Sequence, residues 1–462
     1  MVFSSTVFLF LFLPIVLVIY YNPIFKSRSF RNIFLLLASL GFYAWGEPIF
    51  VFLMILSIIL TWALGILISM RKSKAKIVLF IGITYHVTTL FVFKYLTYIA
   101  GQLGILLNKD FSMIRISLPI GISFFTFQLM SYLFDVYYKK ADVQKNPLYV
   151  GLYVALFPQL IAGPIVRYEK IASEIIDRKE TFDDVILGMQ RFIYGLAKKV
   201  LLANYLAIVA DNTFDYMVGD TTVAMVWLGA ICYTLQIYFD FSGYSDMAIG
   251  LGRMFGFNFD ENFNYPYISK SVTEFWRRWH ISLSSWFRDY VYIPLGGNRV
   301  KKTRWVLNLF VVWLLTGIWH GANWTFVVWG LLYYVMLLAE KIFGYAGKIK
   351  WFTHIYTMFI VLIAWVFFRA NSISDALIYI GNMLGIGATA FIDAAFVANL
   401  KSIAVVLVCA CIGVTPCVKK IVEYLRTTKL RLIESIWLLG VFCLSLLQVI
   451  SSTYNPFIYF NF

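Results

Sequence analysis

A histidine inside an apolar stretch is the residue of this chain best suited to chemistry. His320 lies within residues 314–324, and no lysine or arginine occurs between Arg304 and Lys341. An ionisable side chain at membrane depth is costly, so such residues tend to face a protein interior or a cavity and to mark functional sites. Imidazole titrates near neutral pH and can take a proton from a hydroxyl group. We therefore predict that His320 is a general base; from burial alone, a structural core histidine is the alternative.

Four residues near His320 are candidate substrate-binding residues. Thr316 and Asn323 lie four and three positions from His320. Either can share its helical face and orient the ring or polarise a carbonyl group. Trp319 and Trp324 flank the histidine. We expect these two to line the substrate or to pack.

Residues 271–290 carry the pattern of one amphipathic helix. Ser271 and Glu274 fit a capping box, in which both side chains satisfy free backbone N–H groups, so the helix should begin near Val272. Apolar residues recur on one side. The opposite side is expected to contain Arg277, His280, Ser284 and Arg288. Two interpretations stay open: an interfacial helix with solvated arginines, or a cytoplasmic surface that binds an anionic donor, such as coenzyme phosphates or an acidic carrier protein.

Two aspartates near a predicted span form a third candidate. Asp240 and Asp246 need a partner or water, because an unpaired buried carboxylate is expensive. Their spacing of six residues does not share a helical face. If Gly243 interrupts the helix, both side chains can turn toward one cavity. Structural and catalytic roles both stay open.

The remaining histidines and the cysteines are expected to be structural. His86 and His354 lie in no motif. The five cysteines lie in or beside apolar helices and form no spaced pair with histidines of the zinc-binding kind. We predict no metal site.

The composition excludes a soluble enzyme. Hydrophobic residues make up 61% of the 462 residues and charged residues 14%, which leaves too little polar surface for a soluble domain. The chain is therefore expected to be a polytopic membrane protein that contacts the lipid bilayer. The net charge is +15, and the basic residues fall in short clusters between apolar runs, where they set the membrane topology. No nucleic acid is implied.

The basic clusters predict the topology. We expect about ten to twelve helical spans of roughly 20 residues each, in a single integral membrane domain over residues 1–462 with both termini outside. Residues 101–117 are expected to be an outer loop. Two prolines and a glycine in residues 158–164 predict a broken, re-entrant segment buried in protein. The chain shows no internal repeat, which disfavours a transporter built from repeated halves.

Several ordered motifs resemble the membrane-bound O-acyltransferase (MBOAT) family, most closely its alginate O-acetyltransferase (AlgI) branch. They include residues 275–290 (FWRRWHISLSSWFRDY), 293–297 (IPLGG), 317–324 (GIWHGANW), 118–124 (LPIGISF), 240–246 (DFSGYSD) and 455–460 (NPFIYF). The likeness spans nearly the whole chain.

The resemblance implies a helical fold with a central funnel, an essential histidine at His320 and a second functional histidine at His280. It also implies that an acyl group, usually acetyl, moves from a cytoplasmic thioester such as acetyl-CoA toward an extracytoplasmic polysaccharide such as alginate. No bound cofactor is expected. The implied partners are a secreted SGNH-type acetyltransferase and the polysaccharide synthase and export machinery, at the plasma or inner membrane.

Two alternatives remain. One is D-alanyl transfer to teichoic acids from a carrier-protein donor. The other is a non-enzymatic transporter of donor or glycan, in which His320 is a gate or proton site.

Overall fold

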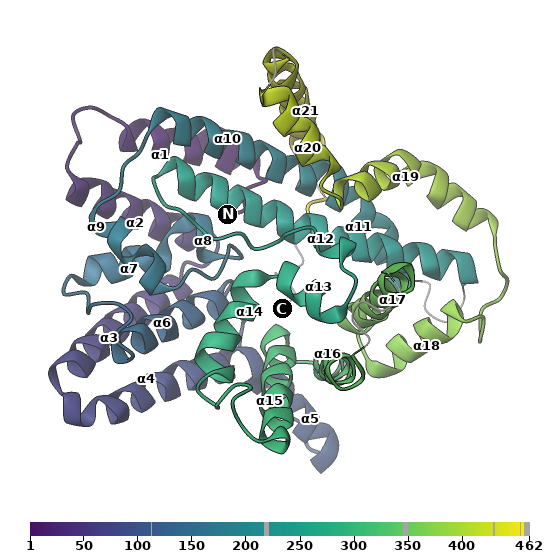
Figure 1. Ribbon diagram of the computed structural model, residues 1–462, viewed down its shortest axis with the longest axis horizontal. Coiled ribbons are helices and arrows are strands. Elements are labelled where there is room, and N and C mark those ends of the chain that lie inside the picture. Colours follow the sequence, from purple (N-terminus) through teal and green to yellow (C-terminus); the bar gives the residue numbers. More distant parts are fainter. Residues whose placement is uncertain (112, 217–220, 345–349, 428–429, 453, 457–462) are drawn as a thin grey trace. The chain divides into compact units, whose positions relative to one another are not determined.

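The chain folds into helices and loops. The computed structural model describes all residues except 112, 217–220, 345–349, 428–429, 453 and 457–462, and the described residues contain no strand (Figure 1). The predicted all-α fold class is therefore confirmed. The chain divides into two compact units: unit 1 is Met1–Phe192 with Ser245–Asp260, and unit 2 is Ile193–Tyr244 with Glu261–Phe462. The single domain and the central funnel stay predictions.

Unit 1 contains most of the N-terminal helices. They are η1 (Phe8–Phe12), α1 (Leu13–Tyr20), α2 (Arg28–Ala44), α3 (Phe50–Met70), η2 (Lys72–Lys74), α4 (Ala75–Leu90), η3 (Phe91–Tyr95), α5 (Leu96–Leu107), α6 (Ile122–Tyr137), α7 (Pro147–Ala155), α8 (Phe157–Leu160), α9 (Tyr168–Ile176) and the first part of α10 (Phe182–Ala197). Helices α3, α4, α6 and α7 pack against one another.

The segment predicted to be broken is short and buried. α8 has only four residues, and each of Pro158, Gly163 and Pro164 lies in the interior of unit 1. Pro158 lies in the first turn of α8, where proline is tolerated, and Pro164 lies beyond the end of this helix. The predicted break and burial are confirmed.

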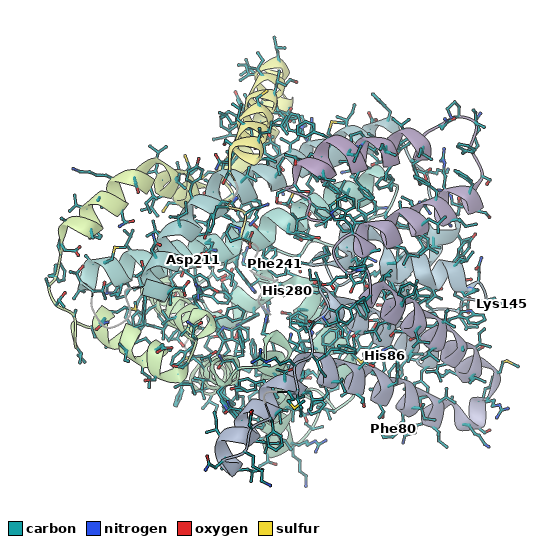
Figure 2. The ribbon with its side chains drawn as sticks, turned by 180° about the vertical axis from the view of Figure 1, so that it is seen from behind. Phe80, His86, Lys145, Asp211, Phe241 and His280 are labelled. Atoms are coloured by element: carbon teal, nitrogen blue, oxygen red, sulfur yellow. The ribbon has the colours of Figure 1, made fainter. Side chains whose placement is uncertain are left out.

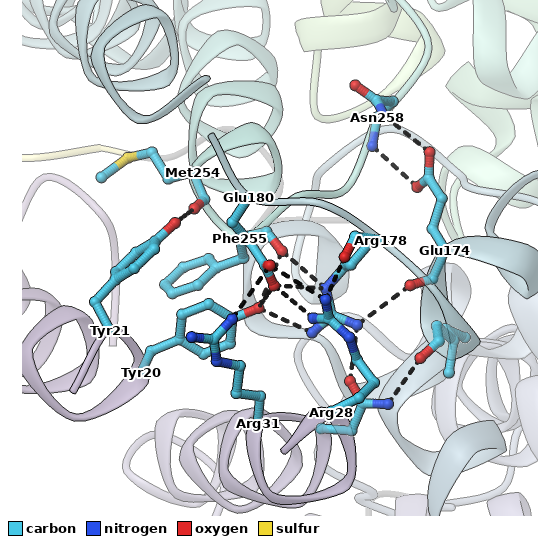
Figure 3. Close-up of polar contacts among 12 residues, drawn as sticks. Tyr20, Tyr21, Arg28, Arg31, Glu174, Arg178, Glu180, Met254, Phe255 and Asn258 are labelled. Atoms are coloured by element: carbon cyan, nitrogen blue, oxygen red, sulfur yellow. Dashed lines mark hydrogen bonds and ion pairs between the residues drawn. The ribbon is translucent and has the colours of Figure 1, made fainter. Parts of the chain in front are cut away.

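A network of polar side chains links α1, α2 and the residues that follow α9 (Figure 3). Arg178 donates to the Phe255 carbonyl oxygen over 2.9 Å. The Glu180 carboxylate accepts hydrogen bonds from Tyr20, Arg28 and Arg31. Since charge-assisted bonds are stronger than neutral ones, this carboxylate holds three segments of unit 1 together.

Unit 2 contains the rest of the helices. They are η4 (Lys198–Ala203), α11 (Asn204–Asp211), η5 (Asn212–Tyr216), most of α12 (Val223–Met254), η6 (Pro266–Ile268), α13 (Val272–Arg278), α14 (Ile281–Phe287), η7 (Arg288–Tyr292), α15 (Lys302–His320), α16 (Trp324–Phe343), α17 (Lys350–Arg369), α18 (Ile373–Met383), α19 (Ala394–Gly413), α20 (Cys417–Thr427) and α21 (Arg431–Ser451). Its core is rich in aromatic side chains from α12, α13, α16 and α17.

Eight helices of the described part are long and apolar enough to cross a membrane. They are Phe50–Met70, Lys72–Leu107, Phe182–Asp215, Val223–Met254, Trp324–Phe343, Phe352–Arg369, Ala394–Gly413 and Leu432–Ser451. The chain is therefore a multi-pass membrane protein. The number of crossings stays a prediction, because shorter apolar helices such as Phe8–Tyr20 are not among the eight. The outer loop predicted at residues 101–117 is wrong in its first part, since the helix continues to Leu107.

Candidate active site

His320 is the last residue of α15 and lies in the interior of unit 2. The helix ends there because Gly321 has extended backbone (φ −174°, ψ 163°). His320 is only 4% exposed. Its ring contacts Trp319, Trp329 and Phe368, at centroid distances of 4.9, 4.8 and 5.1 Å. Since these residues come from α15, α16 and α17, three helices position the imidazole.

Close packing of α15 on α16 fixes the position of this helix end. A Cβ at Gly317 would lie 2.5 Å from the Phe326 carbonyl oxygen, and a Cβ at Gly330 would lie 2.5 Å from the Trp313 carbonyl oxygen. Only glycine allows the two backbones to approach this closely.

His280 lies at a break between α13 and α14. The continuous helix predicted over residues 271–290 is therefore wrong after Arg278. His280 has a left-handed backbone (φ 43°, ψ 55°) and is fully buried. Its ring meets the Phe241 ring edge-to-face at a centroid distance of 4.7 Å. Figure 2 labels both residues. Because of the break, His280 does not lie in an exposed row with Arg277 of α13 and Arg288 of η7.

Trp319 connects the two histidines. Its ring centroid lies 6.1 Å from that of His280 and 4.9 Å from that of His320. The fold of unit 2 thus brings together the two residues for which the sequence predicted function. Both sit among aromatic rings and away from solvent.

The environment keeps the His280 imidazole neutral. Burial lowers its pKa to about 3. A neutral ring cannot pair as a cation with donor phosphates, but it can donate one hydrogen bond and accept another. Its Nδ1 lies 3.1 Å from Asn262 Oδ1. Its Nε2 is buried and has no hydrogen-bond partner among the described residues.

Thr316 and Asn323 are engaged with the backbone. The Thr316 hydroxyl donates to the Val312 carbonyl oxygen over 2.7 Å, so its proton is used within α15. Asn323 caps α16: its Oδ1 accepts from Thr325 N over 3.1 Å, and its Nδ2 donates to the Asn371 carbonyl oxygen over 2.8 Å. Because α15 ends at His320, Asn323 does not share its helical face. The predicted shared helical face is therefore wrong, and a substrate-binding role of Asn323 stays a prediction.

The other predicted substrate-binding residues divide into buried and exposed ones. Trp319 lies in the core with the histidines. Trp324 is 56% exposed at the start of α16, so the structure does not place it with Trp319. Arg277 is exposed as well. Arg288 is exposed, and its Nε lies 2.6 Å from Asp289 Oδ1.

Asp240 and Asp246 have separate partners. α12 runs without interruption through Gly243, so the helix break that would let the two carboxylates turn toward one cavity is absent. In unit 2, Asp240 Oδ1 lies 2.6 Å from Lys199 Nζ. In unit 1, Asp246 Oδ1 lies 2.8 Å from Arg191 Nη2. These ion pairs support the structural reading of both aspartates.

The Ser271 half of the predicted capping box is confirmed, and the Glu274 carboxylate accepts from Lys270 N, one residue before the cap, over 2.9 Å. Ser271 Oγ accepts from Glu274 N over 2.9 Å, and α13 begins at Val272. A second cap was missed. The carboxylate of Glu340 also accepts from Val272 N and Thr273 N, over 2.6 and 2.9 Å. Glu340 comes from the far end of α16, and no pattern in the sequence connects it with this helix start.

Sequence reasoning also missed the residues that surround the two histidines. Trp329 and Phe368 lie in ordinary apolar helical runs, where many aromatic residues look alike. Asn262 precedes the motif of residues 275–290 and carries no spacing signal. A buried asparagine in a polar stretch becomes noticeable only once its partners are known.

The remaining histidines have hydrogen-bond partners within their own units. His86 Nε2 lies 2.8 Å from Thr61 Oγ1, and His354 Nδ1 lies 2.9 Å from the Ser269 carbonyl oxygen. These contacts support the predicted structural roles. In the part of the chain that the structure describes, no group of three or more His, Cys, Asp or Glu side chains could hold a metal ion.

A buried histidine pair in an all-helical membrane protein fits an integral membrane acyltransferase. Residues 40–374 match the membrane-bound O-acyltransferase family, and the chain belongs to this family. It is an O-acyltransferase.

Individual relatives refine this assignment. The chain is similar to the probable alginate O-acetylase AlgI of Pseudomonas aeruginosa, with 43% identity over 389 residues, 81% of this chain and 73% of that protein. It is 35% identical to the peptidoglycan O-acetyltransferase of Helicobacter pylori over 84% of this chain and 80% of that protein. The teichoic acid D-alanyltransferase of Bacillus subtilis is 31% identical over 50% of this chain and 61% of that protein. The AlgI branch is thereby supported.

Proposed function

We propose that this chain transfers an acetyl group from a thioester donor toward hydroxyl groups of an extracytoplasmic polysaccharide, with His320 as the catalytic base. The observation that carries the proposal is the convergence of His320 and His280 on Trp319 in the core of unit 2. Relatives named alginate O-acetylase and peptidoglycan O-acetyltransferase support acetyl as the group and a polysaccharide as the acceptor.

The chemistry requires one proton acceptor. A thioester is already activated, so the acceptor hydroxyl oxygen attacks its carbonyl carbon as His320 takes the hydroxyl proton. The new C–O bond forms and the C–S bond breaks. The thiolate leaves, and the proton held by His320 returns to it. The aromatic rings around His320 exclude water, which protects the thioester from hydrolysis.

His280 supports the same step without changing its charge. Its pKa of about 3 keeps the ring neutral at physiological pH. It therefore acts through a hydrogen bond to the substrate. Attraction of donor phosphates falls instead to exposed cationic groups such as Arg277 and Arg288.

The acetyl donor, the direction of transfer across the membrane and the partner proteins belong to the same proposal. The donor is a cytoplasmic thioester, acetyl-CoA, and the protein lies in the plasma or inner membrane with both termini outside. An SGNH-type acetyltransferase on the outer face passes the acetyl group to the polymer, next to the synthase and export machinery. Deleting this partner should abolish polymer acetylation while this chain is still made; unchanged acetylation would remove the partner from the scheme.

The test of the catalytic role uses purified protein in lipid with an acetyl-labelled thioester. His320→Ala and the better volume match His320→Gln should lower acetyl transfer by about 10²–10⁴-fold, the usual loss when a general base is removed. The control is His86→Gln, which changes another buried histidine and should act through stability. Near-normal turnover of both His320 variants at equal abundance of folded protein would refute the assignment.

The same assay separates the two alternatives. Transfer of D-alanine from a carrier-protein thioester, with none from acetyl-CoA, would favour the activity named for the Bacillus subtilis relative. Movement of donor across the bilayer without thioester cleavage would favour a transporter.

A further inference from the structure

The surroundings of His280 determine which of its ring nitrogens carries the proton. Asn262 is fully buried, and its backbone carbonyl oxygen accepts from Ile281 N over 2.9 Å. Its side-chain oxygen lies 3.2 Å from Ser282 N, 2.8 Å from Ser282 Oγ and 3.1 Å from His280 Nδ1. One amide oxygen thus faces three groups of the segment that follows the helix break.

The Ser282 backbone fixes the orientation of the Asn262 amide. A backbone N–H can only donate, so the amide atom that faces it must be the oxygen. The reversed amide would point its NH₂ group at this N–H, with two donors in contact. The atom 3.1 Å from His280 Nδ1 is therefore an acceptor.

This acceptor requires a proton on His280 Nδ1. Ser282 Oγ also lies 3.4 Å from Nδ1, but its hydroxyl donates over the shorter distance of 2.8 Å to Asn262 Oδ1. An unprotonated Nδ1 would therefore point its lone pair at the lone pairs of the amide oxygen. Because the ring is neutral, the other nitrogen, Nε2, then carries a lone pair. Nε2 is buried, and no group in the described part of the chain hydrogen-bonds to it.

We propose that Asn262 is a positioning residue that holds His280 as the Nδ1–H tautomer, so that Nε2 accepts a hydrogen bond from an O–H or N–H group of the substrate. This inference rests on the proposed function, because it assigns the substrate-facing atom of His280. The substrate group is defined by its chemistry: it is a donor, such as the attacking hydroxyl or an amide N–H of the thioester's carrier arm.

The tautomer can be measured without activity. The chain has four histidines, so a ¹⁵N-histidine NMR spectrum of the protein in lipid is simple enough to assign by difference with His280→Gln. The expected spectrum shows His280 with a protonated Nδ1 and an unprotonated Nε2. A protonated Nε2, in the other tautomer or in an imidazolium at neutral pH, would overturn the proposal.

Variants of Asn262 test whether this residue determines the His280 tautomer. Asn262→Leu has a similar volume but no acceptor, so the Nδ1–H signal should be lost or mixed with that of the other tautomer. Its kcat should fall roughly 10- to 100-fold, as when the group that orients a histidine is removed. Asn262→Asp keeps an acceptor oxygen and should keep the wild-type tautomer. An unchanged tautomer in Asn262→Leu would remove Asn262 from this role.

A matched control separates positioning from packing. Asn308 is another buried asparagine of unit 2, and its Nδ2 donates to the Leu295 and Gly297 carbonyl oxygens over 3.2 and 3.1 Å. Asn308→Leu should leave the His280 signals unchanged, and a shift to the other tautomer in this variant would count against a specific role of Asn262. If the wild-type tautomer is as expected but His280→Gln keeps full transfer, the proposed role of His280 in catalysis fails and the positioning by Asn262 stands.

Discussion

Lys199 and Asp240 form a buried ion pair in the core of unit 2. Their side chains are 4% and 1% exposed, and Nζ lies 2.6 Å from Oδ1. Lys199 also donates to the Pro456 carbonyl oxygen. Charges removed from water are stable only with a partner, so each residue of the pair depends on the other.

We predict that Lys199→Met destabilises the protein by about 3–5 kcal/mol, because it leaves the Asp240 carboxylate buried without its cation. Thermal unfolding in detergent measures the loss. The double variant Lys199→Met with Asp240→Leu should recover most of it. Lys170→Met is the control, since its pair with Asp260 is exposed and should contribute only about 0–1 kcal/mol. A double variant no more stable than Lys199→Met would contradict the prediction.

At the residue scale, the sequence identified the two histidines better than their neighbours. An imidazole in an apolar stretch stands out in any sequence. The role expected of Asn323 depended on a helix that continues past His320, and α15 ends at that residue. Where a helix ends at an extended glycine, spacing along the chain no longer reports which side chains meet.

At the scale of elements, the break between α13 and α14 is the main departure from the expected pattern. The aromatic repeat of residues 271–290 continues through it, so periodicity gave no warning. Phe275 and Trp279 still stack at 5.6 Å across the end of α13. The start of α13 could be predicted because a capping box is a local signal, whereas the break depends on distant partners such as Asn262.

The left-handed backbone of His280 predicts an order of stability among its variants. Asparagine adopts this conformation readily, whereas other side chains pay roughly 1–2 kcal/mol. His280→Asn should therefore unfold at a higher temperature than His280→Ala, although both lose the ring and its activity. Ser284 lies inside α14, where alanine is a better helix former than asparagine. At this control position, Ser284→Ala should therefore unfold at a higher temperature than Ser284→Asn. Equal or greater stability of His280→Ala would show that the backbone at this position is not constrained.

At the scale of the whole molecule, the amino-acid composition was enough to predict the class of protein, a polytopic membrane protein. An apolar chain with few charges and long uncharged runs can only fold as membrane helices. The exact spans were harder to predict. The helix Lys72–Leu107 runs through residues 101–107, which were predicted to lie in a loop. Neither a linker-like segment nor a change in amino-acid composition marks the boundaries between the two units.

The network around Glu180 predicts how unit 1 responds to acid. Burial alone would raise the pKa of this carboxyl, but hydrogen bonds from Arg28 and Tyr20 hold it below the ordinary value of 4.5. Its stabilising effect is therefore fully present above pH 4.5 and is lost as the pH falls through the lowered pKa. Glu180→Gln should be less stable near neutral pH, and the gap to the natural protein should narrow in acid. A gap independent of pH would contradict this.

The positive-inside rule predicts which side of the membrane carries the turn after η7. Asn298 is exposed and precedes Arg299, Lys301 and Lys302. In a chain whose five cysteines are replaced by serine, Asn298→Cys should react with an impermeant maleimide only from the cytoplasmic side. Lys74→Cys, in the basic segment η2, is expected to behave in the same way. Labelling of Asn298→Cys from outside alone would contradict the predicted topology.

The indole rings around His320 give this site an optical signal. Trp319 and Trp329 lie 4.9 and 4.8 Å from the imidazole, within range for contact quenching of their fluorescence. A protonated imidazole accepts an electron from excited indole more readily than a neutral one does. The tryptophan fluorescence should therefore fall when His320 takes a proton from a substrate. It should recover when His320 releases that proton. The difference between the natural protein and His320→Gln would isolate this change among the 14 tryptophans, so turnover can be followed by light without a labelled donor.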